Sequence, residues 1–169
     1  FITKGFAAAE LEGEIQTIDA KTSTITVKKE ERVKTFRFRP SVQVQVNGVK
    51  SKVEALNPGM LLLAESSEPG FATSLEAFGE SSVVKLSEAD VAKLKEALFK
   101  GSWLWNDQAD TPMRFRGDGT VRHRGMSAKW KIVSPRDVLL EVDSGDHLIL
   151  RFDSTFTRYT SPGRKFKGK

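Results

Sequence analysis

The sequence alternates apolar and polar residues in short segments, and residues typical of tight turns close many of them. Between 42 and 46, for example, three valines alternate with Gln43 and Gln45, and Asn47-Gly48 follows directly. A period of two places the valines on one face of a β-strand and the glutamines on the other. Asn-Gly favours a tight turn because both residues tolerate positive φ. The pattern therefore predicts antiparallel β-structure.

Residues 13–80 contain several such segments and form the first predicted module. Strands are expected at 13–18, 24–27, 36–39, 42–46, 60–65 and 71–78, with Pro40 ending the third strand and a single helical turn at 51–56. About six short strands in a segment of this length predict a small barrel or rolled sheet.

Residues 86–100 follow a helical pattern instead. Ser87 is a suitable N-cap, and Val91, Leu94 and Leu98 fall on one stripe of a helix that Gly101 ends. We expect an amphipathic linker helix that packs its apolar stripe against a sheet.

Residues 101–163 return to strand patterns and form the second predicted module. Strands are expected at 102–105, 113–116, 121–124, 127–133, 137–143, 146–153 and 155–160. The predicted fold is therefore all-β and mainly antiparallel, with two small β-barrel or rolled-sheet modules joined by one helix. An N-terminal extension (1–12) and a basic tail (164–169) flank them.

Composition limits the function classes. Hydrophobic residues make up 38% and charged residues 29% of the 169 residues, which fits a soluble globular protein. No apolar run is long enough for a membrane helix. The chain has no cysteine, which excludes disulfides, thiolate chemistry and a cysteine zinc site. Because it begins at Phe1 rather than Met, we expect a trimmed or processed start.

The net charge of +5 arises entirely in the second half. Residues 1–86 carry 11 basic and 11 acidic side chains, whereas residues 87–169 carry 16 and 11. Four of these cations lie in the last six residues: Arg164, Lys165, Lys167 and Lys169. This tail is either a solvated, frayed end or an anchor for an anionic surface.

No motif for a catalytic nucleophile, a phosphate loop or a metal site is present, so we predict a protein without enzymatic activity, metal or cofactor. Asp143, Asp146 and His147 surround Ser144-Gly145. These residues are typical of a hairpin turn, and this interpretation is simpler than the alternative of a metal or acid–base site. The other histidine, His123, is either a hydrogen-bonded core residue or part of a pocket.

The main candidate for a ligand-binding site is a hairpin that carries four arginines. If Gly117-Asp118-Gly119 forms a three-residue loop, then Arg114 faces Arg122, and Arg116 and Arg124 lie on the same face. Like charges directly opposite are unfavourable unless anions neutralise them. Guanidinium groups suit phosphate, sulfate or carboxylate. The alternative is an ordinary outer face neutralised by Asp107, Asp110 or Asp137.

Tryptophans at 103, 105 and 130 allow two interpretations. They form part of the core, or they offer a platform on which sugars or bases stack. The candidate ligand-binding residues are Arg114, Arg116, Arg122, Arg124, Trp103, Trp105 and His123.

Residues 13–78 resemble small bacterial OB-like β-barrel domains of unknown function that occur in exported or envelope proteins. The resemblance lies in Gly13–Asp19, Ile25-Thr26-Val27, Val44–Gly48 and Ala55–Met60. It implies no catalytic residues.

Residues 101–160 resemble bacterial lipocalin-like β domains. Gly101-Ser102-Trp103, Phe115–Val121 and Lys129-Trp130 carry this resemblance. The segment is much shorter than a full lipocalin barrel, so a spacious ligand cavity is not expected.

Together, these features predict a non-catalytic exported or envelope-associated protein, periplasmic or extracellular, that binds or scaffolds through its β surfaces. The alternatives are an OB-like binder of single-stranded nucleic acid or anionic polysaccharide that uses the arginine hairpin, and a hydrolase. The expected partner is a polyanion or another protein, and the oligomeric state is left open.

Overall fold

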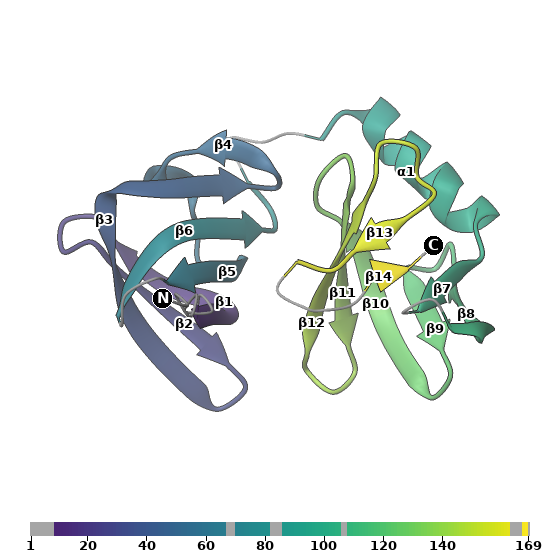
Figure 1. Ribbon diagram of the computed structural model, residues 1–169, viewed down its shortest axis with the longest axis horizontal. Coiled ribbons are helices and arrows are strands. Elements are labelled where there is room, and N and C mark those ends of the chain that lie inside the picture. The colour runs from purple at the N-terminus through teal and green to yellow at the C-terminus, as the bar shows by residue number, and fades with distance from the viewer. Residues whose placement is uncertain (1–8, 67–69, 82–85, 106–107, 163–166, 169) are drawn as a thin grey trace, which may run out of the picture. The chain divides into compact units, whose positions relative to one another are not determined.

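The computed structural model describes the backbone of residues 9–66, 70–81, 86–105, 108–162 and 167–168, and the side chains of these residues except 9–11, 108–111 and 167–168. The chain divides into two compact units, residues 1–84 and 85–169 (Figure 1). The fold is mostly β and mainly antiparallel, with one barrel-like sheet in each unit and a single α-helix among the described residues. The predicted fold class is confirmed.

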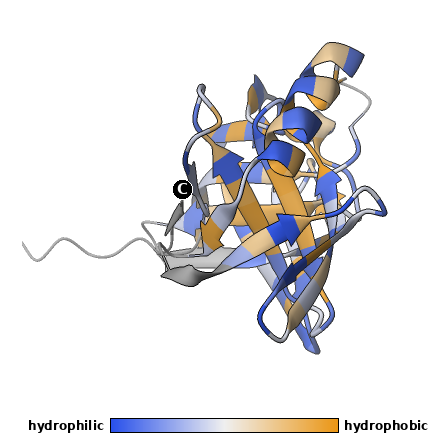
Figure 2. Cartoon of the chain, turned by 90° about the vertical axis from the view of Figure 1, so that its right-hand side faces the viewer, coloured by the Kyte–Doolittle hydropathy of each residue, from blue (hydrophilic) through white to orange (hydrophobic). Residues whose placement is uncertain are grey.

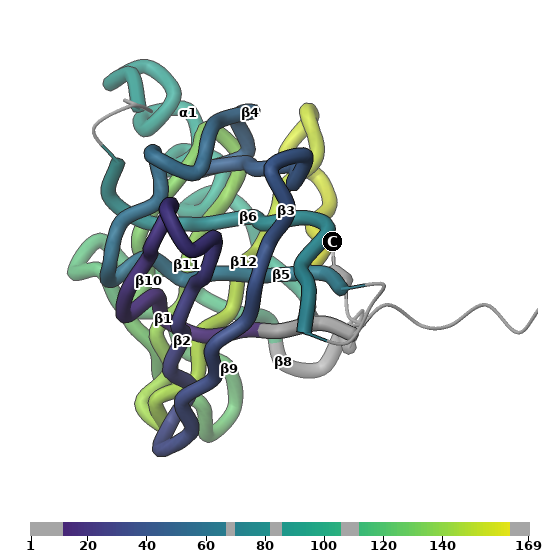
Figure 3. Tube along the Cα trace, turned by 90° about the vertical axis from the view of Figure 1, so that its left-hand side faces the viewer, coloured from purple at the N-terminus to yellow at the C-terminus, as the bar shows by residue number. Residues whose placement is uncertain are grey.

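The first unit is built on a closed ring of five strands. Its elements are β1 (Ala9–Asp19), β2 (Thr24–Lys29), β3 (Arg32–Val46), β4 (Val49–Ser51), a 3-10 turn (Val53–Ala55), β5 (Leu61–Ser66) and β6 (Phe71–Phe78). Around the ring the order is β1-β2-β3-β6-β5 and back to β1, and β4 extends the sheet beyond β3. Every pairing is antiparallel except that of β3 with β6. Figure 3 shows β3 running along β2 and then bending to lie beside β6.

Pro40 does not end a strand, contrary to the prediction. A single strand, β3, contains both predicted segments, 36–39 and 42–46. Its pairing with β2 covers Arg32–Arg37, and its register with β6 shifts between Phe38 and Gln43. Proline lacks a backbone N–H, and it is tolerated here because Pro40 lies where the ladder is interrupted.

The core of the first unit fills the ring. Alternate residues such as Ile25, Phe36 and Val44 point inward and are almost fully buried. Gly13 lies in β1 close to the backbone of β2, and a Cβ atom there would come within 2.8 Å of the Lys28 carbonyl oxygen. This close approach requires glycine.

The second unit begins with α1 (Glu88–Lys100). The Ser87 hydroxyl accepts a hydrogen bond from the Asp90 N–H at 3.1 Å, which confirms the predicted N-cap. Leu94 and Leu98 are buried in the core of this unit. No helix among the described residues has the length and apolar character required to cross a membrane.

The remaining strands form a meander in which each strand pairs with its neighbour in sequence. They are β7 (Trp103–Trp105), β8 (Gln108–Phe115), β9 (Thr120–His123), β10 (Met126–Ile132), β11 (Asp137–Val142), β12 (His147–Phe152), β13 (Tyr159–Thr160) and β14 (Lys167–Gly168). The sheet curls into a half-barrel, and β14 approaches β7. Hydrophobic residues lie mainly on the strands, and hydrophilic ones on the turns and part of α1 (Figure 2).

Two predicted segments at the end of the chain differ from expectation. The predicted strand 155–160 is reduced to β13, because the Asp153 carboxylate accepts a hydrogen bond from the Thr157 N–H at 2.9 Å and closes a loop there. Within the predicted basic tail, Lys167–Gly168 pairs with β13 as β14.

Candidate functional site

The β8–β9 hairpin adopts the predicted register. Arg114 lies opposite Arg122 and Phe115 opposite Val121, and the Arg116 N–H donates to the Thr120 carbonyl at 2.8 Å. Gly119 has a φ of 82°, which closes the three-residue loop with a left-handed residue. The hairpin therefore places arginines directly across from each other on adjacent strands.

The loop of this hairpin is held by Asp118. Its carboxylate accepts hydrogen bonds from the Thr120 hydroxyl at 2.6 Å and from the Thr120 N–H at 2.9 Å. These bonds, together with the nearby Arg116 guanidinium, hold the pKa of Asp118 below its ordinary value. Asp118 therefore stays ionised and fixes the turn.

The arginine side chains are exposed to solvent. Within the described part of the chain, no carboxylate forms an ion pair with Arg114, Arg116 or Arg122. Of the acids considered as neutralising partners, Asp137 is bound by Arg151 in a two-bond pair at 2.8 and 3.1 Å. The side chains of the other two, Asp107 and Asp110, lie outside the described residues.

Arg124 does not lie on the strand face with the other three arginines. β9 ends at His123, which pairs with Met126, and Arg124 has a φ of 50° in the intervening two-residue turn. The left-handed backbone of a turn breaks the alternation on which the prediction relied.

Lys129 joins the arginine face although sequence reasoning did not select it. Lys129 lies on β10 opposite Thr120 of β9, and Ser127 lies on β10 opposite Arg122 of β9. The face that carries the arginines therefore continues from β9 onto β10. Lys129 is exposed. Its alternation with the inward residues Ala128 and Trp130 is the signal that could have identified it. We define the basic face as Arg114, Arg116, Arg122 and Lys129.

The candidate aromatic residues lie on the other side of the sheet. Trp103 is buried in the core, with its ring edge-to-face against Phe152 at a centroid distance of 4.7 Å. Trp105 is half-buried and stacks on the buried His123 at 5.4 Å. The indole N–H of Trp130 donates to the Arg116 carbonyl at 3.0 Å. The structure therefore brings the arginines together but keeps Trp103 and His123 apart from them.

The remaining titratable candidates form a turn. The Gly145 N–H donates to the Val142 carbonyl and the Val142 N–H to the Asp146 carbonyl, both at 2.8 Å, so 143–146 connects β11 to β12. His147 lies opposite Glu141 in the sheet. Among the described residues, no three His, Asp or Glu side chains are grouped closely enough to share a metal ion.

Comparisons with known proteins identify no relative. No known protein family matches the chain, and neither a curated protein nor a solved structure matches it significantly.

Proposed function

We propose that this protein is a non-catalytic binding protein whose basic face holds an anionic polysaccharide. The observation that carries the proposal is the placement of Arg114 directly opposite Arg122, both exposed and without an ion pair to any described residue. Such a pair is unfavourable in the free protein and becomes favourable when an anion lies between the two side chains. Sulfate and carboxylate groups match the guanidinium fork.

Polysaccharide is favoured over single-stranded nucleic acid by the position of the aromatic rings. Proteins that bind single strands without sequence preference stack bases on exposed aromatic side chains. Among the described residues the only aromatic side chain that is largely exposed is Phe99, on α1, and none lies on the basic face. A polymer whose charges are arrayed along its backbone needs only the four cations.

The arrangement of strands supports the finer assignments of the two modules. The ring order β1-β2-β3-β6-β5, with a parallel β3–β6 pair, fits an OB-like barrel. The sequential β7–β14 meander fits a lipocalin-like domain, with an interior filled by side chains such as Met113 and Leu140. The resemblance of the sequence to domains of exported and envelope proteins supports a location outside the cytoplasm, which fractionation of the native cells tests.

The test is heparin affinity at about 50 and 200 mM salt. We compare the unmodified protein with an Arg114→Gln/Arg122→Gln variant. The matched control is Lys28→Gln/Arg32→Gln, which removes two exposed cations from the first unit. A third variant replaces the four cations of residues 164–169 with glutamine.

We expect a slope of about −3 for log affinity against log salt, because about four cations are involved. The Arg114→Gln/Arg122→Gln variant should lose at least about tenfold in affinity, and the control should not. Equal losses in both variants, or a loss only when the tail cations are removed, contradict the proposal. Tighter binding to oligothymidylate than to heparin would favour nucleic acid instead.

A further inference from the structure

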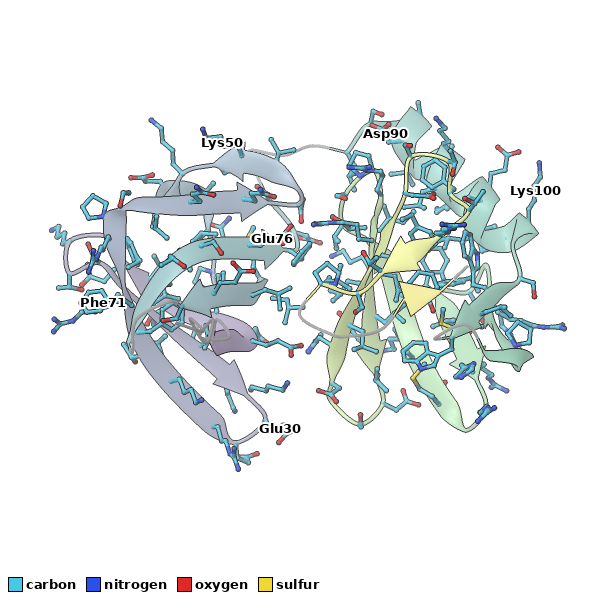
Figure 4. All side chains as sticks on the ribbon, in the orientation of Figure 1. Glu30, Lys50, Phe71, Glu76, Asp90 and Lys100 are labelled. Carbon is cyan, nitrogen blue, oxygen red and sulfur yellow. The ribbon has the colours of Figure 1, made fainter. Side chains whose placement is uncertain are left out.

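The turn between β3 and β4 contains a chemically labile pair of residues. Asn47 and Gly48 form this turn, and both have a left-handed backbone, with φ of 50° and 77°. Lys50 marks β4 just beyond the turn in Figure 4. Asparagine is one of the chemically labile residues of proteins. A following glycine increases this lability, because no side chain hinders the approach of the glycine nitrogen to the amide carbon.

In the folded first unit, the side-chain amide of Asn47 is held away from this reaction. The side chain is buried, and both of its polar atoms are hydrogen-bonded to the backbone of Gly79, directly after β6. The backbone N–H of Asn47 donates to the Ala77 carbonyl oxygen at 2.9 Å. Figure 4 labels Glu76 on the same strand as Ala77. To bring its amide carbon to the Gly48 nitrogen, the side chain has to rotate and give up its bonds to Gly79.

This protection depends on the pairing of β3 with β6. Asn47 and Gly79 are separated by 32 positions in the sequence, and each directly follows one of these two parallel strands. The last pair in the register of the strands is Val46 with Ala77. The contact therefore forms only when this end of the strand pair is closed, and local opening of the strand ends releases the amide.

We propose that Asn47 is a modification site, at which spontaneous deamidation permanently marks a chain whose β3–β6 end has opened. The Gly48 nitrogen loses its proton to solvent base and bonds to Cγ of Asn47. The Cγ–Nδ2 bond breaks, and the side-chain nitrogen takes a proton from water and leaves as ammonia. Water then opens the resulting succinimide ring at either carbonyl carbon, which leaves aspartate or isoaspartate at position 47. Water is the only co-reactant, and nothing is oxidised or reduced.

Neither product can restore the contact with Gly79. An ionised aspartate has no N–H to donate, and it would place a carboxylate oxygen where Nδ2 now lies 2.8 Å from the Gly79 carbonyl oxygen. A buried charge that faces a carbonyl oxygen is strongly unfavourable. Isoaspartate adds a methylene group to the main chain of a two-residue turn, which disturbs the pairing of Val46 with Val49. The modified chain therefore stays open at this end of the ring.

The first test follows deamidation of the full-length protein at mildly alkaline pH, without urea and with enough urea to unfold the chain. Peptide mass spectrometry measures the conversion of residue 47, and an isoaspartate methyltransferase detects the isoaspartate product. The chain supplies an internal control in Asn57, which is exposed but precedes Pro58. Proline has no backbone N–H and cannot supply the attacking nitrogen.

Two glycine variants test whether Gly79 controls the reaction. Gly79→Ala should loosen the contact, because Gly79 has a φ of 147° and a Cβ atom there would lie 3.3 Å from Cγ of Met60. The matched control is Gly70→Ala at the other end of β6, where φ is 81° and nothing lies within 4 Å of a Cβ atom. If Gly79→Ala does not fold, the comparison with and without urea still decides the question.

We expect residue 47 to convert at least about tenfold more slowly in the folded protein than in urea, because only the open fraction reacts. Asn57 should convert far more slowly than residue 47 in urea, and Gly79→Ala should react faster than Gly70→Ala. Equal rates for residue 47 with and without urea overturn the proposal. It is also overturned if Asn57 reacts as fast as residue 47 in urea, or if the two folded glycine variants react equally fast.

The second test measures whether the modification is irreversible in effect. Asn47→Asp reproduces one product and should unfold at a lower urea concentration than the unmodified protein at neutral pH. This loss should shrink at acidic pH, because a protonated carboxyl group can donate to the Gly79 carbonyl, whereas the loss in Asn47→Gly should not shrink in the same way. An Asn47→Asp variant that folds only at acidic pH gives the same support. Unchanged stability of Asn47→Asp at neutral pH overturns the proposal.

Discussion

The side-chain amide of Asn47 forms two hydrogen bonds with the backbone of Gly79. Its Nδ2 donates to the Gly79 carbonyl at 2.8 Å, and its Oδ1 accepts from the Gly79 N–H at 3.0 Å. Asn47 is 3% exposed and has a φ of 50° in the turn between β3 and β4. One residue therefore shapes the turn and also binds the chain where it leaves β6.

Replacing Asn47 with glycine separates these two roles. Asn47→Gly keeps the left-handed turn but removes both side-chain hydrogen bonds, so we expect the free energy of unfolding to fall by about 2 kcal/mol. The matched control is Glu30→Gly at an exposed turn with a φ of 55°, which should be neutral or stabilising by about 0.5 kcal/mol. Urea denaturation measures both. A similar decrease in the free energy of unfolding of both variants would show that the hydrogen bonds to Gly79 do not contribute to stability.

Gly13→Ala should destabilise the first unit. The added methyl group would meet the Lys28 carbonyl oxygen at 2.8 Å, and backbone cannot move aside as a flexible side chain can. We expect a loss of about 2 kcal/mol in thermal or chemical denaturation. Gly117→Ala serves as the control, because nothing lies within 4 Å of a Cβ atom there. A Gly13→Ala variant of unchanged stability would contradict the close approach of the Lys28 backbone to Gly13.

Arg122→Glu should change stability and binding in opposite directions. It replaces a repulsive cross-strand pair with Arg114 by an attractive one, which should raise the free energy of unfolding by about 0.5 kcal/mol at low salt. The same change should abolish salt-sensitive heparin binding. If stability falls, or if heparin binding survives, the unneutralised Arg114–Arg122 pair is not the binding feature.

The stability of the β12–β13 loop should depend on pH through Asp153. The Thr157 N–H, followed by the Thr155 hydroxyl and other donors, lowers the pKa of Asp153 in the folded protein. A group whose pKa is lowered by folding stabilises the protein above its unfolded pKa of about 4. That contribution is lost as the pH falls through the lower, folded pKa. Asp153→Asn should reduce the difference in stability between pH 6 and pH 2.5, and an unchanged difference would contradict this account.

Local patterns predicted local structure well. The limits of α1 follow from Ser87 and Gly101, and the three-residue loop with Gly119 fixed the register of Arg114 against Arg122. Gly101 ends the helix as predicted, but its φ is −78°, so it is not the usual left-handed cap. Glycine is required there because the Trp103 indole occupies the space that a side chain would need.

Features that depend on distant segments escaped prediction. The continuity of β3 through Pro40 depends on partners that change from β2 to β6, and the identity of those partners is not encoded near Pro40. An open depression in the surface of the second unit is lined by Lys93, Trp103 and Phe156, which lie on three separate segments of the chain. A sequence pattern with a period of two or 3.6 residues identifies faces of single elements but does not show which faces meet.

The closed ring of the first unit has a consequence for how the chain folds. β3 can pair with β2 as a hairpin early, but the ring closes only when β6 inserts between β3 and β5. The second unit needs mainly pairings between neighbours in sequence. Because non-local pairing slows folding, the first unit should be the slower to fold. Until the ring closes, the edges of β3 and β5 are open to pairing with other chains. A chaperone that covered these edges during this interval would prevent aggregation.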